Sequence, residues 1–305
     1  MAAAKPAWFC AVAAFAINTC AYTTEILHGA IRAVPAGEVE AARALGMGRW
    51  QALRRIVLPS ALRRSLPAYS NEVVLMLHGF GSSKDEVGGM YAREARALAD
   101  KGIASLRIDF PGFGKSQGDT GATTVDQQLE TARTALDALR KTEGVDPART
   151  GVLGFSLGGG VATLLASSMP REVKSLVTWS SVGDFQQDFL NSLGQKAFDR
   201  AKEDGIVGLD LGWRTIALKQ TFFDSLGKYK IDDAIASYSG AYLTITGSKD
   251  FSAAYSERFV GLAKGPTKDV YMVPDGDHIF GSLGPDQKMA DGVIAKTAEW
   301  FAKTL

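Results

Sequence analysis

One pentapeptide of this 305-residue chain has the pattern of a catalytic nucleophile, and it runs from Gly154 to Gly158 (Gly-Phe-Ser-Leu-Gly). A predicted strand ends just before Ser156 and an apolar helix begins just after it, which is the context that gives the pattern its meaning. The flanking glycines permit a sharp turn that exposes the hydroxyl at the positive end of the following helix. The pattern favours a nucleophilic Ser156 over an incidental serine in a glycine-rich turn.

A serine hydroxyl is a weak nucleophile that needs a general base, and the chain contains 3 histidines. His28 lies in the basic N-terminal segment 1–70, and His78 follows the first predicted strand. His278 lies in the loop after the last predicted strand. We expect His278 to be the base and His78 to be a structural residue of its loop.

A third residue should orient His278 and stabilise its protonated form. Asp250 follows the strand predicted at 241–246 and is the preferred choice. Asp275 and Asp277 are nearer in the sequence, but they share the tight loop of the histidine and are not expected to reach its Nδ1 atom. The alternative role of Asp250 is to cap the helix that begins near Ser252.

The elements that must position these residues alternate between strands and helices from Glu72 onward. The alternation predicts a mainly parallel sheet with helices on both faces, and the segment 182–235, which breaks it, is expected to be a small helical cap. The expected strands are 73–77, 103–108, 149–155, 173–180, 241–246 and 268–273, and the expected helices are 91–101, 124–142, 157–168 and 289–303.

Residues 73–305 resemble the α/β-hydrolase superfamily. The chain order of Ser156, Asp250 and His278 is the order of that family's catalytic triad. The segment 109–116 (DFPGFGKS) also resembles the family's G-x-G-x-S loop. The nearest subgroup is the small bacterial carboxylesterases, some of which hydrolyse feruloyl or cinnamoyl esters. The resemblance therefore implies the α/β-hydrolase fold and a catalytic domain at 71–305.

The same resemblance extends to the segment 78–81 (HGFG), which is similar to the family's oxyanion loop. It implies that the backbone N–H groups of Phe80 and Leu157 bind the oxyanion. One departure is that the family has further strands before the His-Gly strand. A segment of different character occupies their place in this chain.

The resemblance implies a serine carboxylesterase that hydrolyses small acyl or aryl esters through an acyl-enzyme, with no metal or organic cofactor. Feruloyl esterase, thioesterase, lactone hydrolase and peptidase activities share the fold, and a non-catalytic binding protein is a further alternative. Aromatic residues of the cap are candidates for an acyl pocket, although they would equally suit the core of the cap: Phe185, Phe189, Trp213, Phe222 and Phe223.

Residues 1–70 carry eight Lys/Arg against three Asp/Glu, whereas residues 71–305 have a net charge of −4. Residues 8–72 resemble a fragment of amino-acid ABC-transporter permeases, in which a cytoplasmic EAA loop docks on the partner ATPase. The resemblance rests on Glu40-Ala41-Ala42, Gly46 and Ile56-x-Leu58-Pro59. No later segment has 18 consecutive apolar residues, as the spans of a permease would need. We therefore expect a gene fusion with its junction near 73–78, in which residues 1–70 form a mostly helical segment with no independent function.

Composition excludes several other classes. Apolar residues make up 46% and charged residues 22%, as in soluble globular proteins, and a net charge of +1 gives no reason to expect nucleic acid. Cys10 and Cys20 are too few for a disulfide framework or a cysteine-based zinc site. The apolar run 7–17 is short for a membrane span and fits a signal peptide or a buried helix. We expect a cytoplasmic protein, with membrane association or export through residues 7–30 as the alternative.

Overall fold

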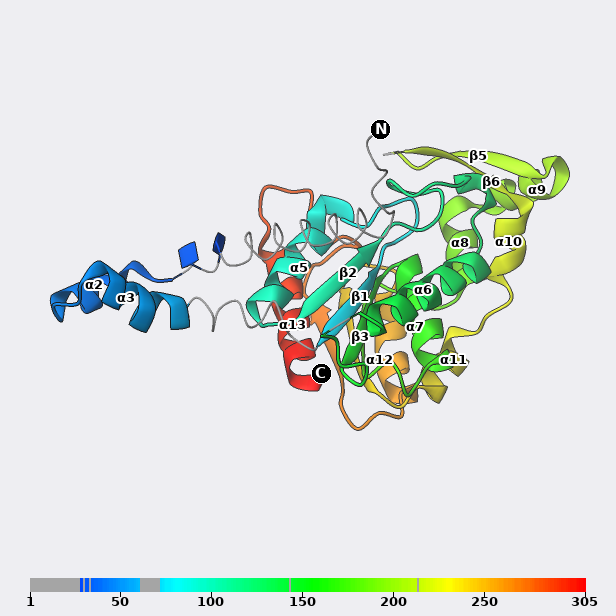
Figure 1. Ribbon diagram of the computed structural model, residues 1–305. Coiled ribbons are helices and arrows are strands. Elements are labelled where there is room, and N and C mark those ends of the chain that lie inside the picture. The colour runs from blue at the N-terminus through cyan, green and yellow to red at the C-terminus, as the bar shows by residue number, and fades with distance from the viewer. Residues whose placement is uncertain (1–27, 30, 33, 61–71, 143, 213) are drawn as a thin grey trace, which may run out of the picture. The chain divides into compact units, whose positions relative to one another are not determined.

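A computed structural model describes residues 28–29, 31–32, 34–60, 72–142, 144–212 and 214–305 (Figure 1). The contacts between Cα atoms divide the chain into two units, Met1–Tyr69 and Ser70–Leu305. The apolar run 7–17, both cysteines and Trp213 lie outside the described residues. Each unit is described separately below.

The described part of the first unit is helical, as the sequence predicts. Helix α2 (Ala36–Ala44) is followed by α3 (Arg49–Ala52), which continues into the π-helical turn η1 (Leu53–Val57). The helices enclose a small apolar cluster made of Val34, Ile31, Val39 and Val57.

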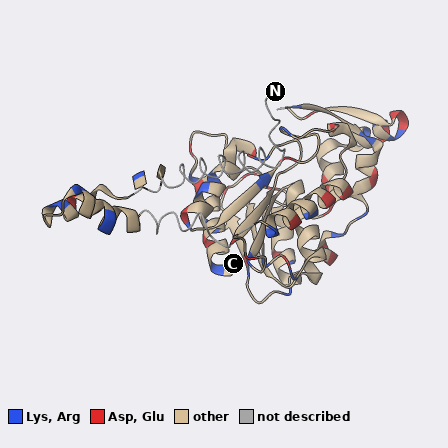
Figure 2. Ribbon diagram, viewed as in Figure 1, with Lys and Arg blue, Asp and Glu red and all other residues tan. Residues whose placement is uncertain are grey.

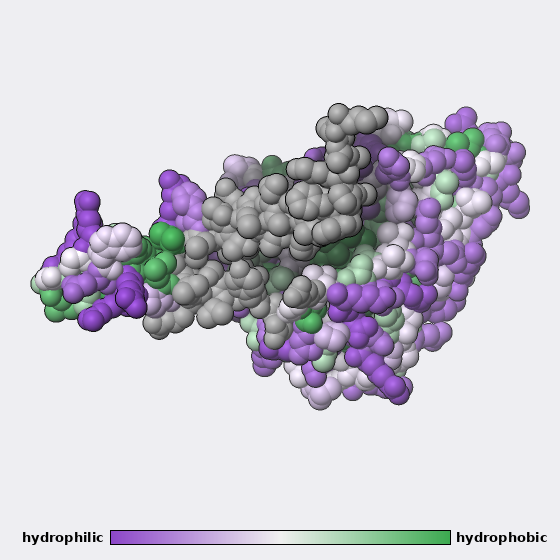
Figure 3. All heavy atoms as spheres, viewed as in Figure 1, coloured by the Kyte–Doolittle hydropathy of each residue, from purple (hydrophilic) through white to green (hydrophobic). Residues whose placement is uncertain are grey.

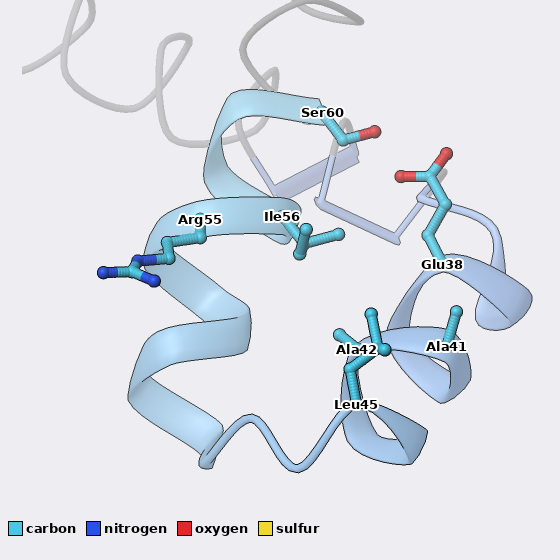
Figure 4. A pocket seen from close by; sticks show the side chains of 7 residues that line it. All are labelled: Glu38, Ala41, Ala42, Leu45, Arg55, Ile56 and Ser60. Carbon is cyan, nitrogen blue, oxygen red and sulfur yellow. The ribbon is translucent and has the colours of Figure 1, made fainter.

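A hollow of about 580 Å³ lies between α2 and η1. Figure 4 shows two of the residues that line it, Glu38 on one side and Arg55 on the other. Two large apolar side chains of this unit, Leu45 and Trp50, are exposed to 77% and 82%. The described residues of the first unit therefore bury little of their apolar surface among themselves.

The second unit is built on a six-stranded parallel sheet with the strand order β2-β1-β3-β4-β7-β8 (Figure 1). The sequence predicted each of the six strands of this sheet to within two residues at both ends, and β2 and β8 lie at the two edges. The strands are β1 (Val73–Leu77), β2 (Ala104–Ile108), β3 (Thr150–Phe155), β4 (Ser175–Trp179), β7 (Ala241–Gly247) and β8 (Lys268–Val273).

Helices cover both faces of the sheet because alternate residues of each strand point to opposite faces. Leu75 and Leu77 face the core that includes α6 and α7, whereas Val74 and Met76 face the core that includes α5 and α13. A central strand that is buried on both sides has to be apolar throughout, as β1 is. The covering helices are α5 (Met90–Asp100), α6 (Val125–Arg140), α7 (Leu157–Ser168), α12 (Ala253–Leu262) and α13 (Lys288–Thr304), with short 3-10 turns η3 (Val87–Gly89) and η4 (Thr120–Ala122).

The insertion between β4 and β7 is helical as predicted, but it also contains an antiparallel hairpin that the sequence analysis missed. Strands β5 (Ile206–Asp210) and β6 (Thr215–Lys219) pair with each other and not with the main sheet. The helices of the insertion are α8 (Phe185–Leu193), α9 (Gln195–Asp204), α10 (Gln220–Leu226) and α11 (Ile231–Ser237).

The face of the second unit that is seen in Figures 2 and 3 is largely polar and of mixed charge. Figure 2 shows Lys and Arg interspersed with Asp and Glu, and hydrophilic residues cover much of this unit on the face seen in Figure 3. Within the described ranges, no helix combines the length and the apolar character that a membrane span requires.

Candidate active site

Ser156 lies in a sharp turn between the end of β3 and the start of α7 (Figure 1). Its backbone has φ 53° and ψ −119°, a conformation that costs a non-glycine residue on the order of 1–3 kcal/mol. A Cβ atom on Gly154 would lie 2.2 Å from the carbonyl oxygen of Gly158, and one on Gly158 would lie 2.2 Å from that of Leu77. The two glycines of the motif are therefore required by the close approach of neighbouring backbone.

The structure brings Ser156, His278 and Asp250 into one chain of hydrogen bonds. Ser156 Oγ is 3.1 Å from His278 Nε2, and His278 Nδ1 is 3.0 Å from Asp250 Oδ1. These contacts join residues that are 122 and 28 positions apart in the sequence. They converge because the three residues follow the parallel strands β3, β7 and β8, whose carboxyl ends lie at one edge of the sheet.

Asp250 is held in place by neighbouring hydroxyl groups. The hydroxyl of Ser252 donates to Asp250 Oδ2 and also hydrogen-bonds to the hydroxyl of Thr246. Burial raises the pKa of Asp250, but the hydrogen bond and the charge of His278, together with Ser252, outweigh it and leave the pKa below its usual value. An ionised Asp250 holds a proton on His278 Nδ1, which leaves Nε2 able to accept the proton of Ser156.

The two aspartates that are nearer to His278 in the sequence have other partners. Asp277 Oδ1 accepts hydrogen bonds from the backbone N–H groups of Ile279 and Gly281, at 3.2 and 2.8 Å. Asp275 pairs with Lys249 Nζ at 2.7 Å on the surface. Both carboxylates therefore shape the loop that carries the histidine.

The loop after β1 lies against the Ser156 turn. A Cβ atom on Gly79 would be 2.8 Å from the ring of Phe155 and 3.3 Å from Ser156 Cβ. Within the part of the chain that the structure describes, the backbone N–H groups of Phe80 and Leu157 donate to no protein acceptor. The N–H of Leu157 also opens helix α7, where the helix dipole favours negative charge.

His78 is a buried neutral residue of the same loop. The Phe110 N–H donates to His78 Nε2 at 3.1 Å, so the proton is on Nδ1, which donates to the Gly79 carbonyl at 2.8 Å. Burial lowers the pKa of His78 to about 4, and the hydrogen bond to Gly79 opposes this shift only in part. The ring therefore connects the loops that follow β1 and β2.

The aromatic residues predicted for an acyl pocket have different positions. Phe189 and Phe222 pack on Phe80, with ring centroids 5.0 and 5.5 Å from it, and Phe223 packs on Phe222 at 5.5 Å. Phe185 lies against α7, since a Cβ atom on Gly160 would be 2.6 Å from its ring. All four rings are buried in one core cluster, in which Phe189, Phe222 and Phe223 lie on the side of Phe80 and Phe185 lies against α7.

No motif in the sequence marks the buried carboxyl groups of Glu86, Glu94 and Asp188, and they were not predicted. Glu86 accepts hydrogen bonds from backbone N–H groups near the Ser156 turn. Neither side-chain oxygen of Glu94, on α5, has a hydrogen-bond partner among the described residues. Among the residues that the structure describes, there is no group of three or more His, Cys, Asp or Glu side chains that could hold a metal ion.

The strand order, the Ser156 turn and the cap between β4 and β7 give the second unit the α/β-hydrolase fold, as the sequence predicted. Residues 69–211 match the family model described as "Serine aminopeptidase, S33". Est1E from Butyrivibrio proteoclasticus, solved with bound ferulic acid, superimposes with a TM-score of 0.63 and 21% identity, over 75% of this chain and 88% of that one. A monoacylglycerol lipase from Paleococcus ferrophilus gives a TM-score of 0.60 and 19% identity, over 76% and 95%. The two structures share the fold, and the family match supports a hydrolase.

Residues 1–82 match the family model described as "Binding-protein-dependent transport system inner membrane component". The chain is 67% identical over 69 residues to the histidine/lysine/arginine/ornithine transport system permease protein HisM of Escherichia coli, which is 23% of this chain and 29% of the permease. The octopine permease OccM of Rhizobium radiobacter is 58% identical over 73 residues, or 24% and 30%. The chain spans less than a third of these permeases. Both resemblances drawn from the sequence are thus confirmed, and the two family matches overlap at 69–82.

Proposed function

We propose that the second unit is a serine carboxylesterase that hydrolyses small acyl or aryl esters through an acyl-enzyme. The observation that carries the proposal is the pair of hydrogen bonds that links Ser156 to His278 and His278 to Asp250. A base within hydrogen-bond distance of a hydroxyl, itself oriented by a buried carboxylate, is the arrangement that activates serine.

In the first step, Ser156 Oγ attacks the ester carbonyl carbon while His278 Nε2 takes the hydroxyl proton. The carbonyl oxygen gains negative charge and is received by the backbone N–H groups of Phe80 and Leu157. Each such donor is typically worth about 2.7–4 kcal/mol of transition-state stabilisation. Asp250 stays ionised and stabilises the protonated imidazole.

The tetrahedral intermediate then collapses, and His278 gives its proton to the leaving alcohol. The alcohol departs and leaves an ester between the acyl group and Ser156. Water attacks this ester while His278 accepts one of its protons, and the same two N–H groups hold the second oxyanion. When this second intermediate collapses, the bond between the acyl carbon and Ser156 Oγ breaks, His278 returns its proton to Oγ, and the acid is released from a regenerated free hydroxyl.

The preference for small acyl or aryl groups rests on the aromatic cluster beside the oxyanion loop. Phe80 stacks on Phe222 with an interplanar angle of 25° and meets Phe189 edge-on at 89°. Phe222 is fully buried and Phe189 is 6% exposed, whereas Phe80 is half-buried, so these two rings support Phe80, which is the ring that a flat apolar group would meet. Est1E, whose structure contains ferulic acid, has the same fold.

The proposal is tested with p-nitrophenyl acetate, butyrate and benzoate. We expect Ser156→Ala to lower kcat on the order of 10⁶-fold without unfolding the protein, because the nucleophile is lost. The matched control is Ser167→Ala, which removes a hydroxyl that donates to a backbone carbonyl of α7. A fluorophosphonate should label the wild type and not the Ser156 variant. Undiminished hydrolysis by Ser156→Ala would reject the proposal.

Because the matched family model is described as a serine aminopeptidase, the substrate panel includes amides. Amino-acid p-nitroanilides release p-nitroaniline and p-nitrophenyl esters release p-nitrophenolate, so each kcat/KM is measured with the extinction coefficient of its own product before the two are compared. We expect the esters to be the better substrates. Preferential cleavage of the anilides, dependent on Ser156, would retain the relay but replace the esterase with a peptidase.

A further inference from the structure

Glu86 is a buried carboxyl group that the hydrolytic cycle does not use. It lies in the loop between β1 and η3, and the residue is only 7% exposed. Its φ of 59° is unusual for a residue other than glycine, so the backbone at this position is strained. A strained, buried acid next to a candidate active site calls for a structural reason.

The contacts of Glu86 reach the loop that carries Phe80. Glu86 Oε2 accepts a hydrogen bond from the Gly79 N–H at 2.6 Å, and Oε1 accepts one from the Val87 N–H at 3.0 Å. Both carboxyl oxygens are therefore engaged by backbone donors. One of these donors belongs to the residue immediately before Phe80.

The other side of Gly79 is held by His78. The Nδ1–H group of His78 donates to the Gly79 carbonyl at 2.8 Å, and the Ser82 N–H donates to the same oxygen at 3.3 Å. The Gly79 carbonyl and the Phe80 N–H belong to one planar peptide group and point in opposite directions. Any contact that fixes this carbonyl therefore also fixes the direction of the Phe80 N–H.

We propose that Glu86 and His78 are positioning residues that together aim the Phe80 N–H at the oxyanion. Glu86 anchors the peptide before Gly79, and His78 anchors the peptide after it. The inference rests on the proposed function, because it assigns these residues to the transition state of that reaction. It adds a carboxyl group that neither the G-x-S-x-G motif nor the relay contains.

The role assigned to Glu86 is geometric. Burial raises the pKa of its carboxyl group, and the hydrogen bonds from Ser82, Gly79 and Val87 oppose that shift. What the loop requires from this side chain is two acceptor oxygens at fixed positions.

The test is Glu86→Gln, which keeps the shape but replaces one acceptor with an NH₂ donor. This donor must face either the Gly79 or the Val87 N–H, so one of the two anchors is lost. Because removal of an oxyanion donor costs about 10²–10³ in kcat, a misaligned donor should cost about 10–100-fold. We expect this loss in kcat for p-nitrophenyl butyrate, with KM changed by less than about twofold, since the donor acts mainly in the transition state.

A second readout separates positioning from general loosening of the fold. Trifluoroacetophenone forms a tetrahedral adduct with an activated serine, whereas acetophenone resembles the ground state. We expect Glu86→Gln to weaken binding of the trifluoromethyl ketone by the same factor as kcat and to leave inhibition by acetophenone unchanged. The matched control is Glu94→Gln, which changes another buried carboxyl group and should leave both readouts as in the wild type.

The outcomes are distinguishable. Ester hydrolysis by the wild type that does not depend on Ser156 would defeat the proposed function itself. Ser156-dependent hydrolysis with unchanged kcat and ketone affinity in Glu86→Gln would overturn only the positioning role. If circular dichroism shows that Glu86→Gln is unfolded, Glu86→Asp is measured in the same way. Loss of the fold in both variants would also overturn the inference, because it would assign Glu86 to stability alone.

Discussion

Asp250 and His278 are paired at 3.0 Å but differ sharply in exposure, with side chains that are 2% and 34% accessible. The buried carboxylate holds one nitrogen of the ring, and the other nitrogen faces the more open side, where Ser156 lies. Nδ1 of His278 is therefore held by the buried carboxylate, whereas Nε2 is the nitrogen that is directed at Ser156. This asymmetry suits a base that must present one nitrogen to the serine and to incoming water.

Replacing this acid is expected to change the tautomer of the base. In Asp250→Asn the amide NH₂ can face Nδ1, which moves the ring proton to Nε2 and blocks acceptance from Ser156. We expect kcat for p-nitrophenyl butyrate to fall about 10⁴-fold with the fold intact. Asp275→Asn, which removes only a surface ion pair with Lys249, should retain wild-type kcat. Equal losses in both variants would contradict the assignment of Asp250.

The neutral state of His78 predicts an acid-sensitive fold. Its pKa is lowered from 6.5 to about 4, so between these values the unfolded chain binds a proton that the folded chain does not. Stability from this group is complete above about pH 6.5 and is lost as the pH falls toward 4, by up to about 3 kcal/mol. Urea unfolding across this range should show the slope in wild type and in His28→Gln. A His78→Gln variant with the same slope would disprove the attribution.

Glu94 predicts the opposite dependence. Burial raises its pKa well above the usual value, so the folded chain retains a proton that the unfolded chain releases. Its contribution is complete below the unfolded pKa and is lost as the pH rises through the folded value. We expect Glu94→Leu to raise the free energy of unfolding by about 1–3 kcal/mol at neutral pH, and by more at alkaline pH. The exposed substitution Glu299→Leu is the control, and a destabilised Glu94→Leu would be the contrary result.

The close approach of neighbouring backbone to the Ser156 turn can be tested at Gly158. In Gly158→Ala the new Cβ atom would meet backbone carbonyl oxygens of Leu77 and His78 at 2.2 and 2.4 Å, which requires the turn to shift. We expect a loss of about 1–3 kcal/mol in stability together with reduced kcat. Gly208→Ala, where nothing lies within 4 Å of the new atom, should show neither effect in thermal unfolding and ester assays.

The aromatic cluster predicts a change in substrate preference. Aromatic pairs contribute about 0.5–1.5 kcal/mol beyond burial, so Phe222→Ala should lower kcat/KM for p-nitrophenyl benzoate about 3–10-fold relative to the acetate. Phe198→Ala is the matched control, because its ring packs on Phe223 at 4.7 Å rather than on Phe80. An unchanged benzoate-to-acetate ratio in Phe222→Ala would place the aryl group elsewhere.

Much of the fold could be predicted because its signals are local. The apolar run of β1 and the strand–turn–helix around Ser156 each fall within a few consecutive residues. The convergence of three loops follows from parallel strands, whose carboxyl ends share an edge. The sequence analysis could therefore nominate Asp250 and His278 from their positions after two strands.

Other features depend on tertiary contacts that leave no local pattern. The β5–β6 hairpin was missed because its strands have only five residues each and carry Lys, Leu and Ala, which also suit helices. Glu86 is an unremarkable acid in the sequence, and its importance arises only when its loop folds back on Gly79. Phe185 and Phe222 are equivalent in sequence terms, yet only the second lies on Phe80.

The strand order has an evolutionary corollary. Every group that we assign to ester hydrolysis follows β1 in the sequence. In the sheet, only β2 lies between β1 and the nearer edge. Recombination upstream of Val73 can therefore replace the preceding segment without changing any residue that is assigned to the reaction. In this chain the residues that precede β1 fall within the match to the permease family, and every group of the proposed reaction lies downstream of β1.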